Sequence, residues 1–188
     1  MLWLTSVNVG RFYHSLHPIS RIRHKVVVET LVVDCFDSRF SEAQFDYYSH
    51  RLRLGRFKRD WQLISIAGGA AAFAHHERQP GYFATLVENL RIKLLHFPVK
   101  NLIVVGHCGC NFAIREHQGE ELPELGFDWA REDTNRVARA FNNRGNSDAC
   151  PIGTAVRDFT GDAIVIFTDI KRGTKDIPVF QDLTRTML

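Results

Sequence analysis

The sequence lacks several features that mark particular classes of protein. No apolar run approaches the ~20 residues that span a bilayer, and the longer runs, such as residues 102–106, have the length of strands. The formal net charge is only +3, from 24 Lys and Arg against 21 Asp and Glu, which gives no indication of a nucleic-acid or anionic-membrane partner. The nucleotide-binding motifs Gly-x-x-x-x-Gly-Lys and Gly-x-Gly-x-x-Gly are also missing. We therefore expect a soluble protein that binds neither nucleic acid nor membranes nor nucleotides.

Cysteine is scarce, and acidic residues are absent from the N-terminal segment. Residues 1–4 are too short for the apolar region of a secretory signal, so we expect a cytoplasmic protein whose four cysteines are metal ligands or buried thiols. The first acidic residue is Glu29, and the Arg-bearing segment before it has the look of a transit peptide. We favour instead an N-terminal arm, residues 1–25, that lies on a partner subunit or is partly disordered.

Residues 26–188 are predicted to form a single α/β domain. Four short apolar runs are rich in β-branched residues, namely 26–33, 62–66, 102–105 and 163–168, and such continuous runs are typical of strands buried on both faces of a sheet. Helical patterns lie between them: one opens with the capping box of Ser41 and Gln44, and two others cover residues 82–97 and 129–144. This alternation predicts a central, mostly parallel β-sheet flanked by helices.

Two of the predicted strands end next to residues whose side chains can bind a metal ion. Open α/β sheets place ligands at the carboxyl ends of their strands, where this chain has Cys35 after the first run and His107 and Cys110 after the third. If these strands are neighbours, two thiolates and an imidazole meet, which is a ligand set that zinc prefers. Three protein ligands leave a fourth position open, as in catalytic zinc sites.

Asp37 and Arg39 follow the first cysteine and stand two residues apart, so they can form an ion pair beside the metal. The Asp37 carboxylate can then accept a hydrogen bond from a zinc-bound water, or it can occupy the open position itself. When Arg39 holds Asp37 away from zinc, the metal can lower the pKa of its water towards ~7. The alternative in which Cys35 is itself a nucleophile fits less well, because the loop is not glycine-rich and Arg39 lies too close to the cysteine for a phosphate-cradling loop.

Over residues 26–115 the chain resembles the β-class carbonic anhydrases. The resemblance rests on two motifs, Cys-x-Asp-Ser-Arg and His-x-x-Cys, which are matched by Cys35, Asp37, Ser38, Arg39, His107 and Cys110. It implies zinc held by Cys35, His107 and Cys110, a catalytic dyad of Asp37 and Arg39, and reversible hydration of carbon dioxide to bicarbonate. It also implies a homodimer or an assembly of dimers, in which the N-terminal arm embraces the partner.

The chain departs from that family at several positions. Ser65 and Ile66 stand where many members have Arg-Asn, Asn111 replaces the glycine after the last ligand, and Cys108 adds a thiol that is conceivable as an alternative ligand. Two further readings therefore stay open: a hydrolase of carbonyl sulfide or carbon disulfide on the same zinc site, and a zinc-binding homologue without turnover.

Other polar clusters have simpler interpretations. For His75, His76 and Glu77 we favour an exposed polar loop over a proton shuttle. The basic residues between 51 and 59 are expected to form a solvated helix face, and Cys150 is expected to be structural or merely exposed.

Overall fold

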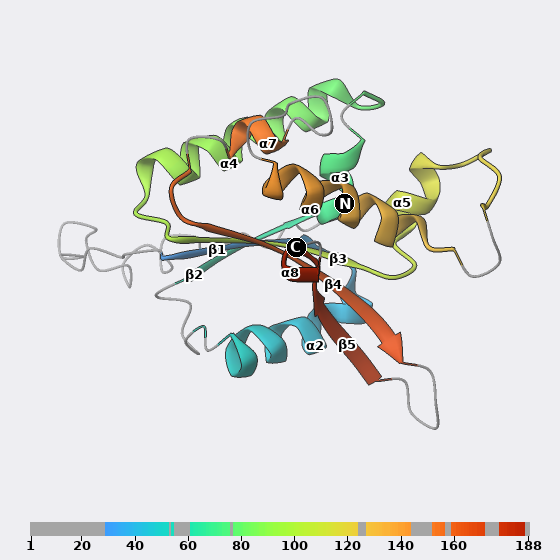
Figure 1. The fold of residues 1–188 in the computed structure, drawn as a ribbon, viewed down its shortest axis with the longest axis horizontal. Helices are drawn as coiled ribbons and strands as arrows, with labels where there is room; N and C mark the ends of the chain where they lie inside the picture. Colours follow the sequence, from blue (N-terminus) through green and yellow to red (C-terminus); the bar gives the residue numbers. More distant parts are fainter. Residues whose placement is uncertain are drawn as a thin grey trace, which may run out of the picture.

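The computed structural model describes residues 29–52, 54, 61–75, 77–123, 127–143, 152–156, 159–171 and 177–186. Its centre is a five-stranded sheet with the order β2-β1-β3-β4-β5, visible edge-on in Figure 1. Four strands run parallel, and β5 pairs antiparallel with β4 at one edge. The predicted fold class, an α/β protein with a mostly parallel central sheet, is confirmed.

The four predicted strands are all present, with somewhat different ends. They are β1 (Thr30–Cys35), β2 (Trp61–Ile66), β3 (Asn101–His107) and β4 (Asp162–Lys171). β1 lies between β2 and β3, and all six of its residues are buried. Helices on both faces of a parallel sheet explain why its strands read as continuous apolar runs.

Alternate residues of the strands feed two apolar clusters, one on each face of the sheet. Leu31 and Val33 belong to the larger cluster, which includes the buried side of α6 (Trp129–Asn142). Val32, between them, belongs to the smaller cluster with Tyr48 of the π-helical segment η2 (Tyr47–Arg51) and Trp61. In Figure 1, α3, α4, α6 and α7 lie on one side of the sheet and α2 on the other. The remaining bounds are α2 (Ser38–Asp46), α3 (Ala70–Ala74), α4 (Pro80–His96), α5 (Asn111–Glu116), α7 (Ile152–Ala155) and α8 (Leu183–Thr186).

The first helix begins four residues earlier than the capping box of Ser41 and Gln44 predicts, since its N-cap is Asp37 rather than Ser41. Asp37 is the N-cap of α2, and its side chain accepts a hydrogen bond from the backbone N–H of Arg39. Ser41 instead donates its hydroxyl to the carbonyl of Ser38. An aspartate at the N-cap satisfies one of the free N–H groups of the first turn, so the helix starts at the residue after Asp37.

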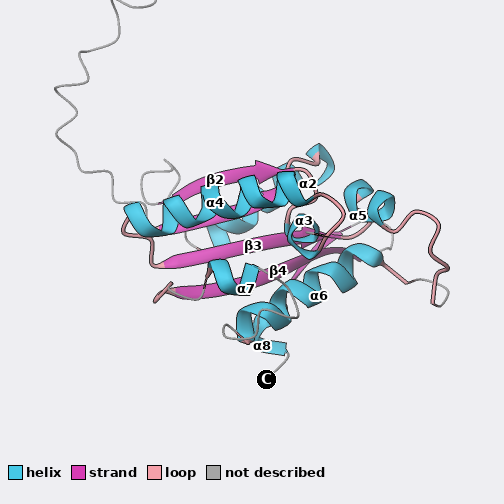
Figure 2. Cartoon of the chain, turned by 90° about the horizontal axis from the view of Figure 1, so that it is seen from above, coloured by secondary structure: helices cyan, strands magenta, loops and turns pink. Residues whose placement is uncertain are grey.

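β5 (Ile177–Asp182) is an additional strand that the sequence patterns did not predict. Pro178 interrupts its short apolar run, and a proline is tolerated in a strand at the edge of a sheet because one side has no strand partner. Figure 2 shows how α4 runs along the strands, while α3 and α5 lie towards the end of the sheet to which β2 points.

Several predictions lie outside the described residues. The N-terminal arm over residues 1–25, Cys150 and most of the basic cluster between 51 and 59 fall in this category. Among the helices that the structure describes, none has the length and apolar character required to cross a membrane.

Candidate metal centre

The three residues predicted to bind metal come together at the carboxyl end of the sheet. Cys35 ends β1, His107 ends the neighbouring strand β3, and Cys110 is the residue before α5. The pairing of Val33 with Val104 places these two strand ends almost level. The two Sγ atoms and an imidazole nitrogen lie within 4.8 Å of one another, and the residues are only 7%, 1% and 2% exposed, for Cys35, His107 and Cys110 respectively.

His107 offers a free ring nitrogen to this group. Its Nδ1 lies 3.0 Å from the carbonyl oxygen of Cys108, a contact in which Nδ1 must be the donor. Its Nε2 is buried and has no hydrogen-bond partner among the residues that the structure describes. A buried polar atom without a partner is costly, and a backbone carbonyl on the other ring nitrogen is the usual arrangement for a histidine that binds metal. The residues present therefore fit a metal ion.

The thiols of Cys35 and Cys110 shift the pKa of each other in opposite directions. The Cys110 thiol donates to Cys35 and, with the nearby His107, lowers the pKa of Cys35 well below its usual range despite burial. The same contact and burial raise the pKa of Cys110. Burial acts to lower the pKa of His107, but the neighbouring Cys35 thiolate outweighs it and the pKa of His107 is raised. A divalent cation bound here would displace the thiol protons, because it binds thiolate and neutral imidazole.

Asp37 and Arg39 form the predicted ion pair next to the ligands. The Arg39 Nε lies 2.9 Å from Asp37 Oδ1, and Nη2 lies 2.5 Å from Oδ2. Hydrogen bonds from Arg39 lower the pKa of Asp37 to about 2. The Asp37 Oδ2 is 4.0 Å from His107 Nε2, so an ionised carboxylate faces the candidate metal position.

The loop between the two motif ligands is held from both sides. Arg39 Nη2 donates to the carbonyl of Gly109 over 3.0 Å, and the N–H of Gly109 donates to Asp128 Oδ2 over 3.3 Å. Gly109 has a φ of +58°, which favours glycine. Arg39 therefore positions both the Asp37 carboxylate and the loop that carries Cys110.

The sequence patterns did not single out the buried carboxylate of Asp34, the residue directly before Cys35. Asp34 accepts hydrogen bonds from Ser65 Oγ at 2.8 Å and from the Tyr48 hydroxyl at 3.4 Å. Burial nevertheless raises its pKa to about 6. Two features of the sequence could have indicated this contact. Asp34 interrupts an apolar run, and it pairs across β1 and β2 with Ser65, one of the positions where the chain differs from the β-class carbonic anhydrases.

Gly69 allows the turn after β2 to approach the first ligand closely. A Cβ at this position would lie 2.5 Å from the carbonyl oxygen of Val105 and 2.8 Å from the backbone nitrogen of Cys35, and φ is +51°. Both separations are shorter than real Cβ contacts, so only glycine fits here without displacement of β1 or β3.

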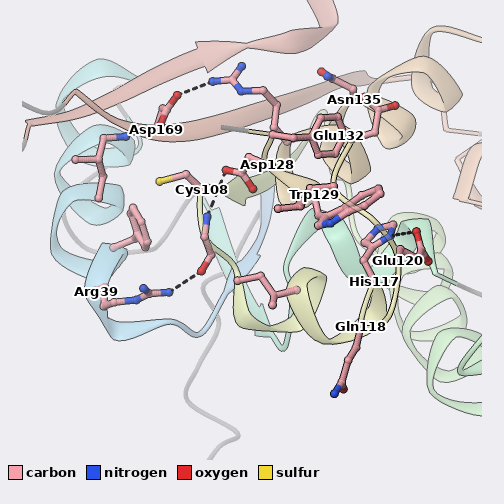
Figure 3. Close-up of a pocket in the computed structure, with 17 residues that line it drawn as sticks. Arg39, Cys108, His117, Gln118, Glu120, Asp128, Trp129, Glu132, Asn135 and Asp169 are labelled. Carbon is pink, nitrogen blue, oxygen red and sulfur yellow. Dashed lines mark hydrogen bonds and ion pairs between the residues drawn. The ribbon is translucent and has the colours of Figure 1, made fainter. Parts of the chain in front are cut away.

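A pocket of about 1150 Å³ adjoins the centre on the side of Arg39. Arg39, Cys108 and Gly109 line one part of it, and His117, Glu120 and Trp129 line another (Figure 3). Cys108 is half-buried and lies outside the group formed by the other three side chains, so it is not placed as an alternative ligand. Burial raises the pKa of Cys108, which disfavours its thiolate.

The prediction that His75 belongs to an exposed loop is wrong. His75 is 5% exposed and its Nε2 contacts Asp133, because α6 packs directly against α3 and supplies a buried polar partner. Glu77 is exposed, as expected.

No protein-family model and no curated protein matches the chain. Among solved structures, the chain is similar to the β-carbonic anhydrase of the fungal pathogen Aspergillus fumigatus, with 14% identity and a TM-score of 0.40 over 85% of this chain and 78% of that chain. A similarity of this size assigns neither family nor activity.

Proposed function

We propose that this chain binds one zinc ion through Cys35, His107 and Cys110 and catalyses the reversible hydration of carbon dioxide. The observation that carries the proposal is the buried convergence of these three side chains, with the His107 Nε2 lacking a hydrogen-bond partner in the described part of the chain. Two thiolates and one imidazole are a set that suits zinc. When bound with an open coordination position, zinc acidifies a water molecule and so supplies a nucleophile near neutral pH.

The Asp37–Arg39 pair would orient that water. Both carboxylate oxygens of Asp37 are engaged by Arg39, and the low pKa of Asp37 keeps it ionised at neutral pH. Since Oδ2 lies 4.0 Å from the His107 Nε2, the carboxylate is close enough to the ligands to accept a hydrogen bond from the reacting water. The hydrogen bonds from Arg39 hold the Asp37 carboxylate in place, so Arg39 would favour a role of Asp37 as hydrogen-bond acceptor over a role as fourth ligand.

The immediate surroundings of the ligands suit a small apolar substrate. The Phe40 ring lies 4.4 Å, centroid to centroid, from the His107 ring, and the buried Ile66 pairs with Cys35 across β1 and β2. Carbon dioxide has no net dipole and needs no hydrogen-bond donor to enter such surroundings. Arg39, which lines the adjoining pocket, supplies a cation towards which a bicarbonate anion can leave.

A second candidate function is hydrolysis of carbonyl sulfide or carbon disulfide with the same residues. The observation that favours it is that neither residue 65 nor residue 66 offers a polar group to a substrate. The Ser65 hydroxyl donates to Asp34, and Ile66 is apolar. Apolar surroundings of this kind discriminate little between carbon dioxide and its sulfur analogues.

The two functions are separated by their products. Zinc-loaded protein would be assayed for proton release from carbon dioxide and for sulfide release from carbonyl sulfide, with Cys35→Ser as the control that lacks one of the three proposed ligands. Hydration of carbon dioxide at a higher kcat/KM than sulfide release supports the first proposal, and the reverse order supports the second. Full zinc occupancy with neither reaction would leave a zinc-binding protein without turnover.

A further inference from the structure

A second group of ligand-type side chains lies apart from the cysteines. His75 follows α3, His117 follows α5, and Asp133 lies in the second turn of α6. Their ligand atoms, two imidazole nitrogens and a carboxylate oxygen, also lie within 4.8 Å of one another. Because three separate helical segments contribute, the group exists only when these segments are packed together.

The Asp133 carboxylate lies between the two imidazoles. Its Oδ2 is 2.7 Å from His75 Nε2, and its Oδ1 is 3.1 Å from His117 Nε2. The side chains of His75 and Asp133 are only 5% and 4% exposed. A buried carboxylate requires a compensating positive charge, and within the described segments its ion-pair partners are these two histidines, which are charged only when protonated.

The other ring nitrogen of His117 faces a second carboxylate. Its Nδ1 lies 2.8 Å from Glu120 Oε2, and Arg78 forms an ion pair with Glu120. The His117 ring also stacks on Trp129 with centroids 3.8 Å apart and an angle of 10° between the planes. A carboxylate that fixes Nδ1–H, together with a packed ring, is the usual support for a histidine that binds metal through Nε2.

We propose that His75, His117 and Asp133 form a second binding site for a divalent transition-metal ion, distinct from the cysteine-containing centre. Two ligand atoms at ~2.1 Å from one metal ion lie ~3.0–3.4 Å apart in octahedral or tetrahedral geometry. The nitrogen-to-oxygen separations here are 2.7 Å to Oδ2 and 3.1 Å to Oδ1 of Asp133, one slightly below this range and one within it. With His117 holding its proton on Nδ1, its Nε2 is free to bind the ion. The ion supplies the positive charge that the buried carboxylate requires.

The pocket gives the proposed ion a route to solvent. His117, Glu120 and Trp129 line it, and Figure 3 shows His117 and Glu120 joined beside Trp129 on the wall away from Arg39. His75 and Asp133 do not line the pocket themselves, so an ion would reach them past His117. The ligand set holds nitrogen and oxygen without sulfur, which suits zinc, cobalt(II), nickel(II), manganese(II) or iron(II) rather than copper(I).

The helix α5 connects the two centres. Cys110 is the residue immediately before it, and His117 is the residue immediately after it. The two sites therefore share no ligand but lie at opposite ends of the same six-residue helix, and each can be removed by a substitution that leaves the ligands of the other unchanged.

The test counts zinc ions bound by the full-length chain after chelator treatment and titration with zinc alone. We expect two zinc ions per chain for the natural sequence, one for Cys35→Ser and one for Asp133→Asn. Glu132→Gln is the matched control, since Glu132 is the neighbouring carboxylate of α6 and pairs with Arg139 outside the cluster; it should still bind two. X-ray absorption of zinc-loaded Cys35→Ser should show only nitrogen and oxygen ligands.

A measurement without any substitution covers the case in which a variant does not fold. In a cobalt(II) titration of the natural sequence, thiolate-to-cobalt absorption should saturate at one equivalent while bound cobalt rises to two. A natural chain that stops at one metal, all of it thiolate-bound, would overturn the proposal and leave His75, Asp133 and His117 as a hydrogen-bonded clamp between helices. Zinc bound by Cys35→Ser but unaffected by Asp133→Asn would also overturn it.

Discussion

The two candidate metal centres of this chain are built by different parts of the fold. Cys35 and His107 end two neighbouring parallel strands, and Cys110 follows three residues later. His75 and Asp133, in contrast, lie 58 positions apart in the sequence and belong to different helical segments. Carboxyl ends of parallel strands meet by topology, whereas helix ends meet only through tertiary packing. The first centre therefore depends on strand register, and the second depends on how α3, α5 and α6 pack.

The largest effect is expected at the strand-end centre, the group of Cys35, His107 and Cys110. Cys35→Ser removes a thiolate ligand, so zinc at this centre and carbon dioxide hydration should both fall to background levels. Metal analysis and a stopped-flow indicator assay measure the two quantities. Cys108→Ser is the matched control because Cys108 lies outside the ligand group. Equal loss in both variants would contradict the assignment of ligands.

Gly69 tests whether the strand-end centre depends on close backbone packing. Gly69→Ala should lower the free energy of unfolding by about 2–5 kcal/mol, the sum of left-handed backbone strain and overpacking. Gly109→Ala should cost only about 1–2 kcal/mol, because a Cβ there meets nothing within 4 Å although φ is also positive. Urea unfolding provides the values. Equal costs would show that the turn after β2 is not packed against Cys35.

Asp37→Asn separates orientation of the reacting water from metal binding. The amide oxygen can still cap α2, but the charge that pairs with Arg39 is lost. We expect kcat/KM for hydration to fall by roughly 10–100-fold with zinc content unchanged. Asp46→Asn at the exposed end of the same helix should have no effect. Full activity of Asp37→Asn would remove the dyad from the proposed mechanism.

The smallest effect is expected at the helix-packed centre, the group of His75, His117 and Asp133. In the Cys35→Ser background, zinc at ten times its Kd should stabilise the fold by about 1.4 kcal/mol through mass action. Thermal unfolding with and without zinc measures this shift. Asp133→Asn in the same background should abolish the shift, whereas Glu132→Gln should retain it. A shift that survives Asp133→Asn would place the zinc elsewhere.

The sequence was sufficient to predict the parts of the fold that carry local signals. Strands buried on both faces appear as uninterrupted apolar runs, so β1 to β4 were identified. The sequence also indicated that Cys35, His107 and Cys110 lie together, because each of their motifs directly follows such a run. The start of α2 was placed wrongly because Ser41 offers a capping pattern as well, and the contact between Asp37 and Arg39 that decides the position is visible only in three dimensions.

Other features depend on partners that are distant in the sequence. Three polar residues in a row at positions 75–77 favour exposure, but Asp133 provides a buried partner for His75 that no local pattern reveals. β5 was missed because Pro178 disfavours a strand unless its edge position is known. The carboxylate of Asp34 is tolerated in a buried strand because Ser65 and Tyr48 donate to it from other elements.

The most direct test of the central claim is to measure zinc content and carbon dioxide hydration on the same sample during stepwise return of zinc to chelator-treated protein. The account predicts that the hydration rate rises in proportion to the zinc bound by thiolates and reaches its maximum when one such ion is bound per chain. Thiolate-bound zinc at one per chain with a rate no higher than that of buffer would contradict it.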